Sequence, residues 1–306
     1  MGGQAVIEGV MMRSPHSYAV AVRQPSGALA VTQDYLDKPE EKHPWLKYPV
    51  LRGLGVLGQA LALGVRALRY SAEQAIETPD APGPGSAKPH KPKDLNGFVL
   101  ALNVAFSLAF FIVLYKLVPL YLATGLTHRY LRTDNNLAFN LLDGFIRIAL
   151  FVGFLLLISQ WKDIQRVFEY HGAEHKVVRA FEKQGPMDVA AARACARFHP
   201  RCGTSFLLVV MGIAMVLYMF LPFHAFWLRF VGRLLLLPVI AGISYEFIRF
   251  AAKSKGRLWK WASQPGLWLQ RVTTREPDDS QLETALKALE TAMMLEQNRG
   301  GELVVA

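Results

Sequence analysis

Long apolar runs alternate with shorter polar stretches over the last two thirds of the chain. Four of these runs, at residues 97–122, 141–160, 204–221 and 226–250, are long and apolar. Each could cross the roughly 30 Å hydrocarbon layer of a membrane as a helix, because an α-helix rises about 1.5 Å per residue. The pattern therefore predicts a mainly α-helical polytopic membrane protein with about four transmembrane helices.

The N-terminal region is patterned differently. Residues 17–24 and 28–35 alternate loosely between apolar and polar positions around Pro25-Ser26-Gly27, which predicts a small β-hairpin. The stretch 2–9 is punctuated by glycines, and we expect it to be flexible. Residues 50–75 have a helical pattern but are only moderately apolar. We expect them to form an interfacial or re-entrant helix rather than a span.

The C-terminal region predicts a further helix. Residues 279–297 are amphipathic and begin with a capping box at Ser280 and Glu283. We expect this helix to pack on the cytosolic part of the protein, with a free tail as the alternative. The expected domains are an N-terminal β-hairpin with an interfacial helix (1–77), a Pro-rich linker (78–96), a four-helix membrane domain (97–250) that includes a cytosolic metal-site loop (161–202), and cytosolic C-terminal helices (251–306).

The distribution of charge predicts the orientation. Lys and Arg gather before the first span, between the second and third spans, and directly after the fourth. Because basic residues are enriched in cytoplasmic loops, both termini and the 161–202 segment are expected in the cytosol. That arrangement needs an even number of spans, which agrees with the hydropathy pattern.

Composition bears on partners and compartment. The net charge of +10 would favour nucleic-acid binding in a soluble chain, but no nucleic-acid motif accompanies it. We expect membrane lipid as the partner and no specific nucleic acid, with a protein partner or homo-oligomer as a further candidate. The 2 cysteines, Cys195 and Cys202, are too few for a disulfide framework, which fits a reducing compartment.

The sharpest chemical motif is His171-Gly172-Ala173-Glu174-His175. Positions i and i+4 of a helix share a face, so His171 and His175 could hold one metal ion. Glu174 could then serve as the catalytic base toward a metal-bound water, as in the inverted zincin pattern H-x-x-E-H. The alternative is a pair of surface histidines beside the membrane.

A second cluster, His199-Pro200-Arg201-Cys202, has a two-ligand spacing that suits zinc. With the first motif it would complete the set His171, His175, His199 and Cys202. Four such ligands close a tetrahedral shell and are typical of structural zinc, whereas three leave a position open for catalysis. The expected cofactor is a divalent metal, Zn²⁺ in the first instance. Cys195 has no partner at ligand spacing and is expected to be a buried packing residue.

Two acidic residues are additional candidates. Glu246, at the cytosolic end of the fourth span, could supply the distant glutamate ligand of the inverted zincins. Glu8 lies among glycines and apolar residues and could be a ligand, a general acid or a solvated loop charge. Lys176 and Arg179 could hold an anionic headgroup, although ordinary cytosolic basic charges are the simpler account.

Several sequence blocks are similar to those of the YqhQ-like family of bacterial membrane proteins, domain of unknown function 1385. In order they are GGQAVIEGVMMRSP, FEYHGAEHKVV, HPRCGTSF, GISYEF and PGLWLQRVTTREP. They cover most of the chain. The family is described as predicted metal-dependent enzymes, with no assigned reaction. The resemblance implies a bacterial cytoplasmic membrane setting and supports the four-residue metal site, but it implies no substrate.

Two functions from different classes follow. The first is a membrane metal-dependent hydrolase with Glu174 as base, acting on a peptide or lipid at the cytosolic surface. The second is a non-enzymatic membrane protein whose structural metal fixes the 161–202 segment while its basic face docks a partner or lipid. A third hypothesis, a transporter, is suggested by the Gly-broken helices and the intramembrane Glu246.

Overall fold

The computed structural model describes residues 1–37, 41, 43–75, 97–131, 135–199, 202–221, 223, 225–253 and 257–299. The strands are β1 (Gly2–Val6), β2 (Gly9–Arg13), β3 (Ser17–Arg23) and β4 (Leu29–Tyr35). The helices are η1 (Pro44–Lys47), α2 (Leu51–Ala75), α3 (Gly97–Ile112), η2 (Val113–Leu117), α4 (Val118–Leu126), η3 (Thr127–Leu131), α5 (Asn136–Ile158), α6 (Lys162–Glu182), α7 (Val189–Arg193), α8 (Gly203–Tyr218), α9 (Phe226–Leu235), α10 (Leu237–Lys253), α11 (Arg257–Thr273) and α12 (Asp279–Asn298). The predicted linker at 78–96 lies outside the described residues.

The N-terminal strands form one antiparallel sheet in the order β1-β2-β3-β4. The predicted hairpin is the second half of this sheet, but the expectation that residues 2–9 are flexible was wrong. Residue 9 of β2 must be a glycine because the neighbouring strand lies very close to it. A Cβ atom at this position would lie 2.3 Å from the carbonyl oxygen of Ala21. The two-residue turn between β1 and β2 places Glu8 in the left-handed region, with φ of 52°.

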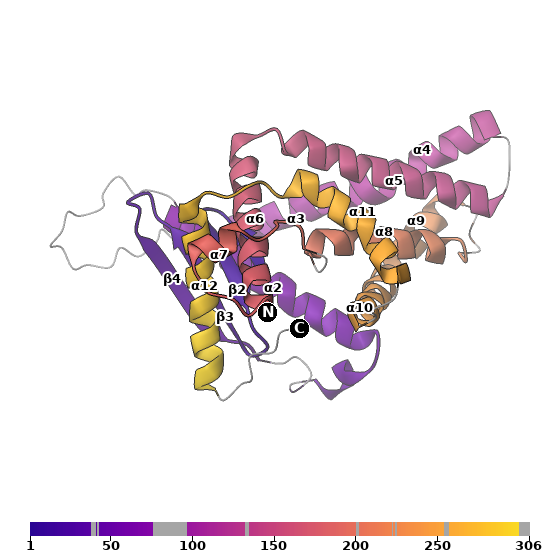
Figure 1. The fold of residues 1–306 in the computed structure, drawn as a ribbon. Coiled ribbons are helices and arrows are strands. Elements are labelled where there is room, and N and C mark those ends of the chain that lie inside the picture. Colours follow the sequence, from indigo (N-terminus) through magenta and orange to yellow (C-terminus); the bar gives the residue numbers. More distant parts are fainter. Residues whose placement is uncertain are drawn as a thin grey trace.

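Both faces of the sheet are covered (Figure 1). On one face Val10, Met12, Ala19 and Ala21 pack against α6 and α12. On the other face Met11, Val20 and Val22 pack against Leu63 and Ala67 of α2. The core of this sheet layer is therefore assembled from four parts of the chain: the N-terminal strands, α2, α6 and α12.

The segment expected as a cytosolic loop at 161–202 is mostly helical, since it contains α6 and α7. Tyr170, Ala173, Val177 and Phe181 recur at helical spacing and are buried in the core against the sheet and α12. Cys195 joins the same core, as predicted.

The C-terminal helix also forms as predicted and packs on the sheet rather than forming a free tail. Its predicted cap was wrong, however. The capping box uses Asp278 and Gln281, so the helix starts about two residues earlier than Ser280 and Glu283 would place it.

Among the described residues, three helical stretches are long and apolar enough to cross a membrane: Leu51–Ala75, Leu102–Tyr130 and Asn136–Ile158. A fourth candidate is the pair α9–α10, which bends by 47°. The third expected span is shorter than predicted, because its helix, α8, ends at Tyr218 and has 16 residues. Conversely α2, expected not to span, meets the criterion, although Leu63 and Ala67 bind it to the sheet.

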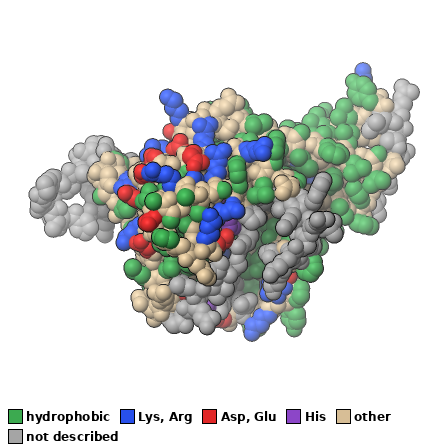
Figure 2. Space-filling model, viewed as in Figure 1, with side chains coloured by type: hydrophobic (Ala, Val, Ile, Leu, Met, Phe, Trp, Pro, Cys, Tyr) green, Lys and Arg blue, Asp and Glu red, His purple; other side chains and the backbone are tan. Residues whose placement is uncertain are grey.

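Charge and hydrophobicity separate along the molecule. Figure 2 shows charged side chains gathered over the end that contains the sheet, α7 and α12, and hydrophobic side chains over the helical end. Exposed large hydrophobic residues are frequent along α3 and its continuation, including Phe106, Phe110 and Tyr121. Such a surface is compatible with a membrane protein. We refer to α3, η2, α4, α5, α8, α9 and α10 as the helical domain.

Candidate metal centre

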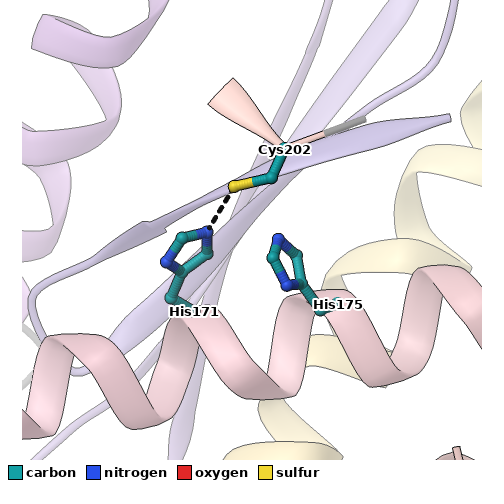
Figure 3. A group of neighbouring side chains, drawn as sticks. All are labelled: His171, His175 and Cys202. Atoms are coloured by element: carbon teal, nitrogen blue, oxygen red, sulfur yellow. Dashed lines mark hydrogen bonds between the residues drawn. The ribbon is translucent and has the colours of Figure 1, made fainter. Parts of the chain in front are cut away.

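Helix α6 presents His171 and His175 on one face, toward Cys202 at the start of α8 (Figure 3). One ligand atom from each of these three residues lies within 4.8 Å of the others. The Sγ atom of Cys202 is 3.3 Å from Nε2 of His171. His175 and Cys202 are buried, while His171 is half-buried.

The backbone fixes the tautomer of both imidazoles. Nδ1 of His171 donates to the carbonyl oxygen of Thr273 at 2.8 Å, and Nδ1 of His175 donates to that of Arg197 at 2.6 Å. A carbonyl oxygen only accepts, so each Nδ1 carries the proton and each neutral ring keeps its lone pair on Nε2. Metal-binding histidines are typically oriented by this kind of bond.

Helix α11 holds the backbone of His199, three residues before Cys202 in the sequence. The side chain of Gln270, on α11, accepts from the backbone N–H of His199 at 2.8 Å and donates to its carbonyl oxygen at 2.7 Å. Cys202 is the N-cap residue of α8. Negative charge is favoured at a helix N-terminus, and the thiolate is the form of cysteine that binds metals.

Gly172 allows the segment after α11 to cross α6. A Cβ atom at this position would lie 2.0 Å from the carbonyl oxygen of Arg275. The backbone N–H of Arg275 also donates to the carbonyl oxygen of Phe168 at 2.9 Å. This close crossing brings the Thr273 carbonyl to His171, so Gly172 determines the geometry of its neighbour in the motif.

Glu174 is buried between α6 and β1. The N–H of Gly3 donates to its carboxylate, and a Cβ atom on Gly3 would lie only 2.6 Å from Cγ of Glu174. An oxygen of the Glu174 carboxylate lies 3.5 Å from Nε2 of His175. The carboxyl therefore sits beside the ligand atom of His175 without belonging to the three-residue group.

Burial shifts the pKa values of both neighbours. Burial raises the pKa of Glu174, although the nearby His171 and His199 act in the opposite direction. Burial lowers the pKa of His175, with hydrogen bonding to Cys202 opposing it. Both shifts favour the uncharged side chains, since a buried charge loses its hydration.

The other candidate ligands lie elsewhere. Nε2 of His199 is 3.0 Å from the carboxylate of Glu182, and the His199 ring centroid is 5.7 Å from that of His175. Glu246 forms an ion pair with Arg52 on α2. Among the described residues, the structure therefore brings together three of the predicted ligands, and neither His199 nor Glu246 is in that group.

Glu8 lies at the tip of the β1–β2 turn and pairs with Arg166 of α6. Its carboxylate also accepts from the hydroxyl of Tyr170 at 3.4 Å. These contacts attach the hairpin to α6, a structural role that the sequence did not suggest. Lys176 and Arg179 are likewise engaged within the protein, because their side chains donate to the backbone carbonyls of Arg193 and Phe198.

The donor set fits a divalent transition metal. Two imidazole nitrogens and one thiolate suit Zn²⁺, whose ligands stand about 3.3–3.6 Å apart at bond lengths of about 2.0–2.3 Å. The three atoms are already within 4.8 Å of one another, so small side-chain rotations would close the site. In zinc sites, three protein ligands leave a fourth position open to water, whereas four protein ligands close the shell.

Sequence reasoning missed the residues that position the ligands. Gln270 and Thr273 belong to the block PGLWLQRVTTREP, and Gly3 belongs to GGQAVIEGVMMRSP. Apart from Glu8, these two blocks offered the sequence analysis no candidate ligand or catalytic residue. Their role becomes apparent only when the fold places them against α6.

Two comparisons with known proteins find relatives of this chain. A family described as "Protein of unknown function (DUF1385)" matches residues 48–295. Over 301 residues the chain is 34% identical to a protein described as "Uncharacterized protein YqhQ" from Bacillus subtilis (strain 168), covering 96% of this chain and 92% of the relative. No solved structure matches the chain.

Proposed function

Because the chain belongs to the DUF1385 family, as its sequence blocks predicted, and because its His, His and Cys side chains converge, we propose that it is a membrane-embedded, zinc-dependent hydrolase. It acts at the cytosolic surface of the bacterial cytoplasmic membrane, with both termini in the cytosol. The observation that carries the proposal is the set of two Nε2 lone pairs and one thiol within 4.8 Å, with both Nδ1 protons held by backbone carbonyls.

Each residue has a distinct task in this proposal. His171, His175 and Cys202 hold the metal, which would act as a Lewis acid and lower the pKa of a bound water. Glu174 takes a proton from the nucleophile and returns it to the leaving group. A buried carboxyl with a raised pKa suits both steps, because efficient acid–base catalysts have pKa values near the working pH.

The location of the centre favours a substrate at the membrane surface. His175 lies on α6, which packs on the sheet, while Cys202 begins α8 of the helical domain. The metal would therefore lie where the charged and the apolar ends of the molecule meet. A peptide or lipid that reaches the membrane surface from the cytosol is the substrate class that fits this position.

Metal content and ligand count test the site directly. Full-length protein purified in detergent should carry about one zinc per chain, with two nitrogen ligands, one sulfur ligand and a light oxygen ligand by X-ray absorption. Cys202→Ser should lose the sulfur ligand and most of the metal, whereas Cys195→Ser, in the sheet core, should keep both. A metal-free wild-type protein would refute the proposal.

Glu174→Gln separates catalysis from structure. The variant should keep its zinc but lose turnover of labelled phospholipid vesicles or of a mixed peptide library, whichever the wild type cleaves. The second candidate function, a structural metal in a non-enzymatic protein, is favoured by the fact that the ligands join two different helices. It predicts a closed shell of nitrogen and sulfur ligands and a silent Glu174→Gln, with reduced protein abundance in His171→Ala.

A further inference from the structure

A second polar cluster lies inside the helical domain, among side chains that the metal centre does not use. Arg147 and Asp143 are one turn apart on α5, and Arg233 reaches them from α9. The side chains of Arg147, Asp143 and Arg233 are 3%, 1% and 1% exposed, so the group is inside the domain and away from solvent. Lys116, on η2, completes it by donating to the hydroxyl of Tyr218 at 2.8 Å.

The charges in this cluster do not balance. Asp143 is the single acidic side chain in the described parts of α3 to η3, α5, α8 and α9. Three cations, Lys116, Arg147 and Arg233, face this one carboxylate, which leaves an excess of two positive charges. Even with Lys116 uncharged an excess of one remains, because a guanidinium stays protonated in proteins. Buried charge without a partner is costly, so the cluster calls for an anion.

One hydrogen-bond donor in the cluster has no partner. Nε of Arg147 donates to the carbonyl oxygen of Tyr115 at 3.1 Å, and Nη2 donates to Asp143. Nη1 of the same guanidinium is buried without an acceptor. Arg233, by contrast, donates through Nη1 to Asp143 at 2.6 Å and through Nη2 to Asn140 at 2.9 Å. The open donor of Arg147 thus marks the side on which an anion would bind.

The ring of Tyr218 lies at the centre of the cations. Lys116, Arg147 and Arg233 stand 5.3, 5.1 and 4.7 Å from its centroid. Cation–π attraction holds the three positive groups close together in spite of their mutual repulsion. The cluster is therefore organised as a cationic cup rather than as a set of separate ion pairs.

The backbone is irregular at the same place. Lys116 belongs to the π-helical segment Val113–Leu117, and Arg233 lies just before the 47° bend between α9 and α10. Single π-turns and broken helices within membrane domains are frequent at binding sites. This observation is independent of the charge count and points to the same residues.

We propose that Lys116, Arg147 and Arg233 bind a phosphate group inside the helical domain. The planar guanidinium fork matches oxyanions better than spherical halides, and the carboxylate of Asp143 already shows an oxyanion bridging both arginines. The phosphate group comes either from an anionic phospholipid headgroup or from inorganic phosphate. Asp143 competes with it for the same donors and sets its affinity.

The test uses the full chain in nanodiscs of phosphatidylcholine alone. One arm measures equilibrium binding of radiolabelled inorganic phosphate, and the other measures retention of added phosphatidylglycerol by native mass spectrometry. Lys116→Gln and Arg147→Gln should weaken the binding seen in either arm by about tenfold or more, because each removes a charged donor. Asp143→Asn should tighten it, since the internal competitor is neutralised.

Arg229→Gln is the matched control, because Arg229 is a cation on α9 one turn before Arg233 whose Nε donates instead to the carbonyl oxygen of Phe223. It should bind as the wild type does. If gel filtration shows that Arg147→Gln is misfolded, the binding measured for Lys116→Gln alone tests the proposal. Phosphate binding in the first arm identifies a free anion, and lipid retention in the second identifies a headgroup. Binding in neither arm, or wild-type binding by Lys116→Gln, overturns the proposal.

Discussion

The candidate metal centre and the cationic cluster of the helical domain differ in the atoms that they turn inward. At the sheet end, His171, His175 and Cys202 present lone pairs, because backbone carbonyls hold both Nδ1 protons. In the helical domain, Arg147 and Lys116 present N–H donors and an excess of positive charge. The first arrangement suits a cation and the second suits an anion.

The difference lies in which atoms of each cluster remain unpaired, and in the helical domain the excess of positive charge acts in the same direction. Both clusters are largely buried, with His171 half-buried, and both contain side chains with several nitrogen atoms. At the metal centre the carbonyls of Thr273 and Arg197 use the only protons of the neutral rings. In the helical domain the carbonyl of Tyr115 uses one guanidinium donor of Arg147 and leaves Nη1 open.

The largest expected effect separates the two clusters by metal binding. His171→Ala and His175→Ala should each weaken zinc binding by about a hundredfold or more, because each removes a ligand that the fold holds in place. Lys116→Gln should leave zinc affinity unchanged. Competition with a zinc-chelating dye measures all three. Loss of zinc in Lys116→Gln would show that the clusters are not separate sites.

His199→Ala serves as the sharpest control for this prediction. Because Nε2 of His199 is bonded to Glu182, its removal should lower zinc affinity by at most about tenfold, as expected for a residue outside the ligand set. A loss as large as that of His171→Ala would instead restore the four-ligand site expected from the sequence.

The next effect concerns the carbonyl that orients His171. Gly172→Ala places a methyl group 2.0 Å from the Arg275 carbonyl oxygen, so the segment after α11 must move. We expect a loss of about 2–3 kcal/mol in the free energy of unfolding, together with weaker zinc binding as the Thr273 acceptor shifts. Thermal melting and zinc competition measure the two effects.

Gly153→Ala is the matched control, since a Cβ atom at Gly153 on α5 would meet nothing within 4 Å. It should leave zinc binding unchanged and stabilise α5 slightly, because Ala favours helix over Gly. Equal zinc affinity in Gly172→Ala and the wild type would contradict the role of the Thr273 carbonyl.

These glycines also explain what could be predicted from sequence and what could not. The i, i+4 spacing of His171 and His175 correctly predicted that both imidazoles lie on one face of a helix, because helix geometry is local. Gly3 and Gly9 weaken the strand signal of residues 2–13, so two strands were missed. The fold requires glycine at both positions, because a Cβ atom would strike Glu174 or Ala21.

Other features of the two clusters depend on contacts made over long distances in the sequence. Cys202 was proposed as a ligand together with His199 because H-x-x-C has a ligand spacing, but Gln270 clamps the backbone of His199 while its ring bonds to Glu182. No local pattern announces a clamp that comes from α11. The cationic cluster was missed for the same reason, since Arg233 meets Asp143 only in the folded helical domain.

A smaller effect is expected at Gly3, which distinguishes the carboxyl beside the metal centre from the ligands themselves. Gly3→Ala crowds Cγ of Glu174 at 2.6 Å and the Met11 carbonyl oxygen at 2.9 Å. We expect a loss of about 1–2 kcal/mol in stability and reduced turnover, with zinc still bound. Gly2→Ala is the adjacent control, because its Cβ atom would meet nothing within 4 Å. If Gly3→Ala loses zinc while Gly2→Ala keeps it, the result would indicate that Glu174 is itself a zinc ligand.

The smallest effect concerns a third polar cluster. Its carboxylate receives hydrogen bonds from neighbouring groups of the protein. The Glu296 side chain, on α12, is fully buried. It accepts from the hydroxyls of Ser14 and Ser17, from the backbone N–H of His16 at 3.0 Å and from its Nδ1 at 2.6 Å. With so many donors of its own, this cluster needs no ligand, in contrast to the other two.

The contribution of Glu296 to the free energy of unfolding should depend on pH, and the direction follows from its pKa shift. Burial alone would raise the pKa of Glu296, but the hydrogen bonds from Ser14 and His16 outweigh burial and hold the pKa below its ordinary value of 4.5. The ionised carboxylate therefore stabilises the folded protein fully at pH values above the ordinary pKa of 4.5. This stabilisation is lost as the pH falls through the lower, folded-state pKa. Glu296→Gln should cost about 1 kcal/mol at neutral pH, and the gap from wild type should close below about pH 4.5. Urea unfolding across this range measures the gap, and a gap that instead widened in acid would show that Glu296 is held in its protonated form.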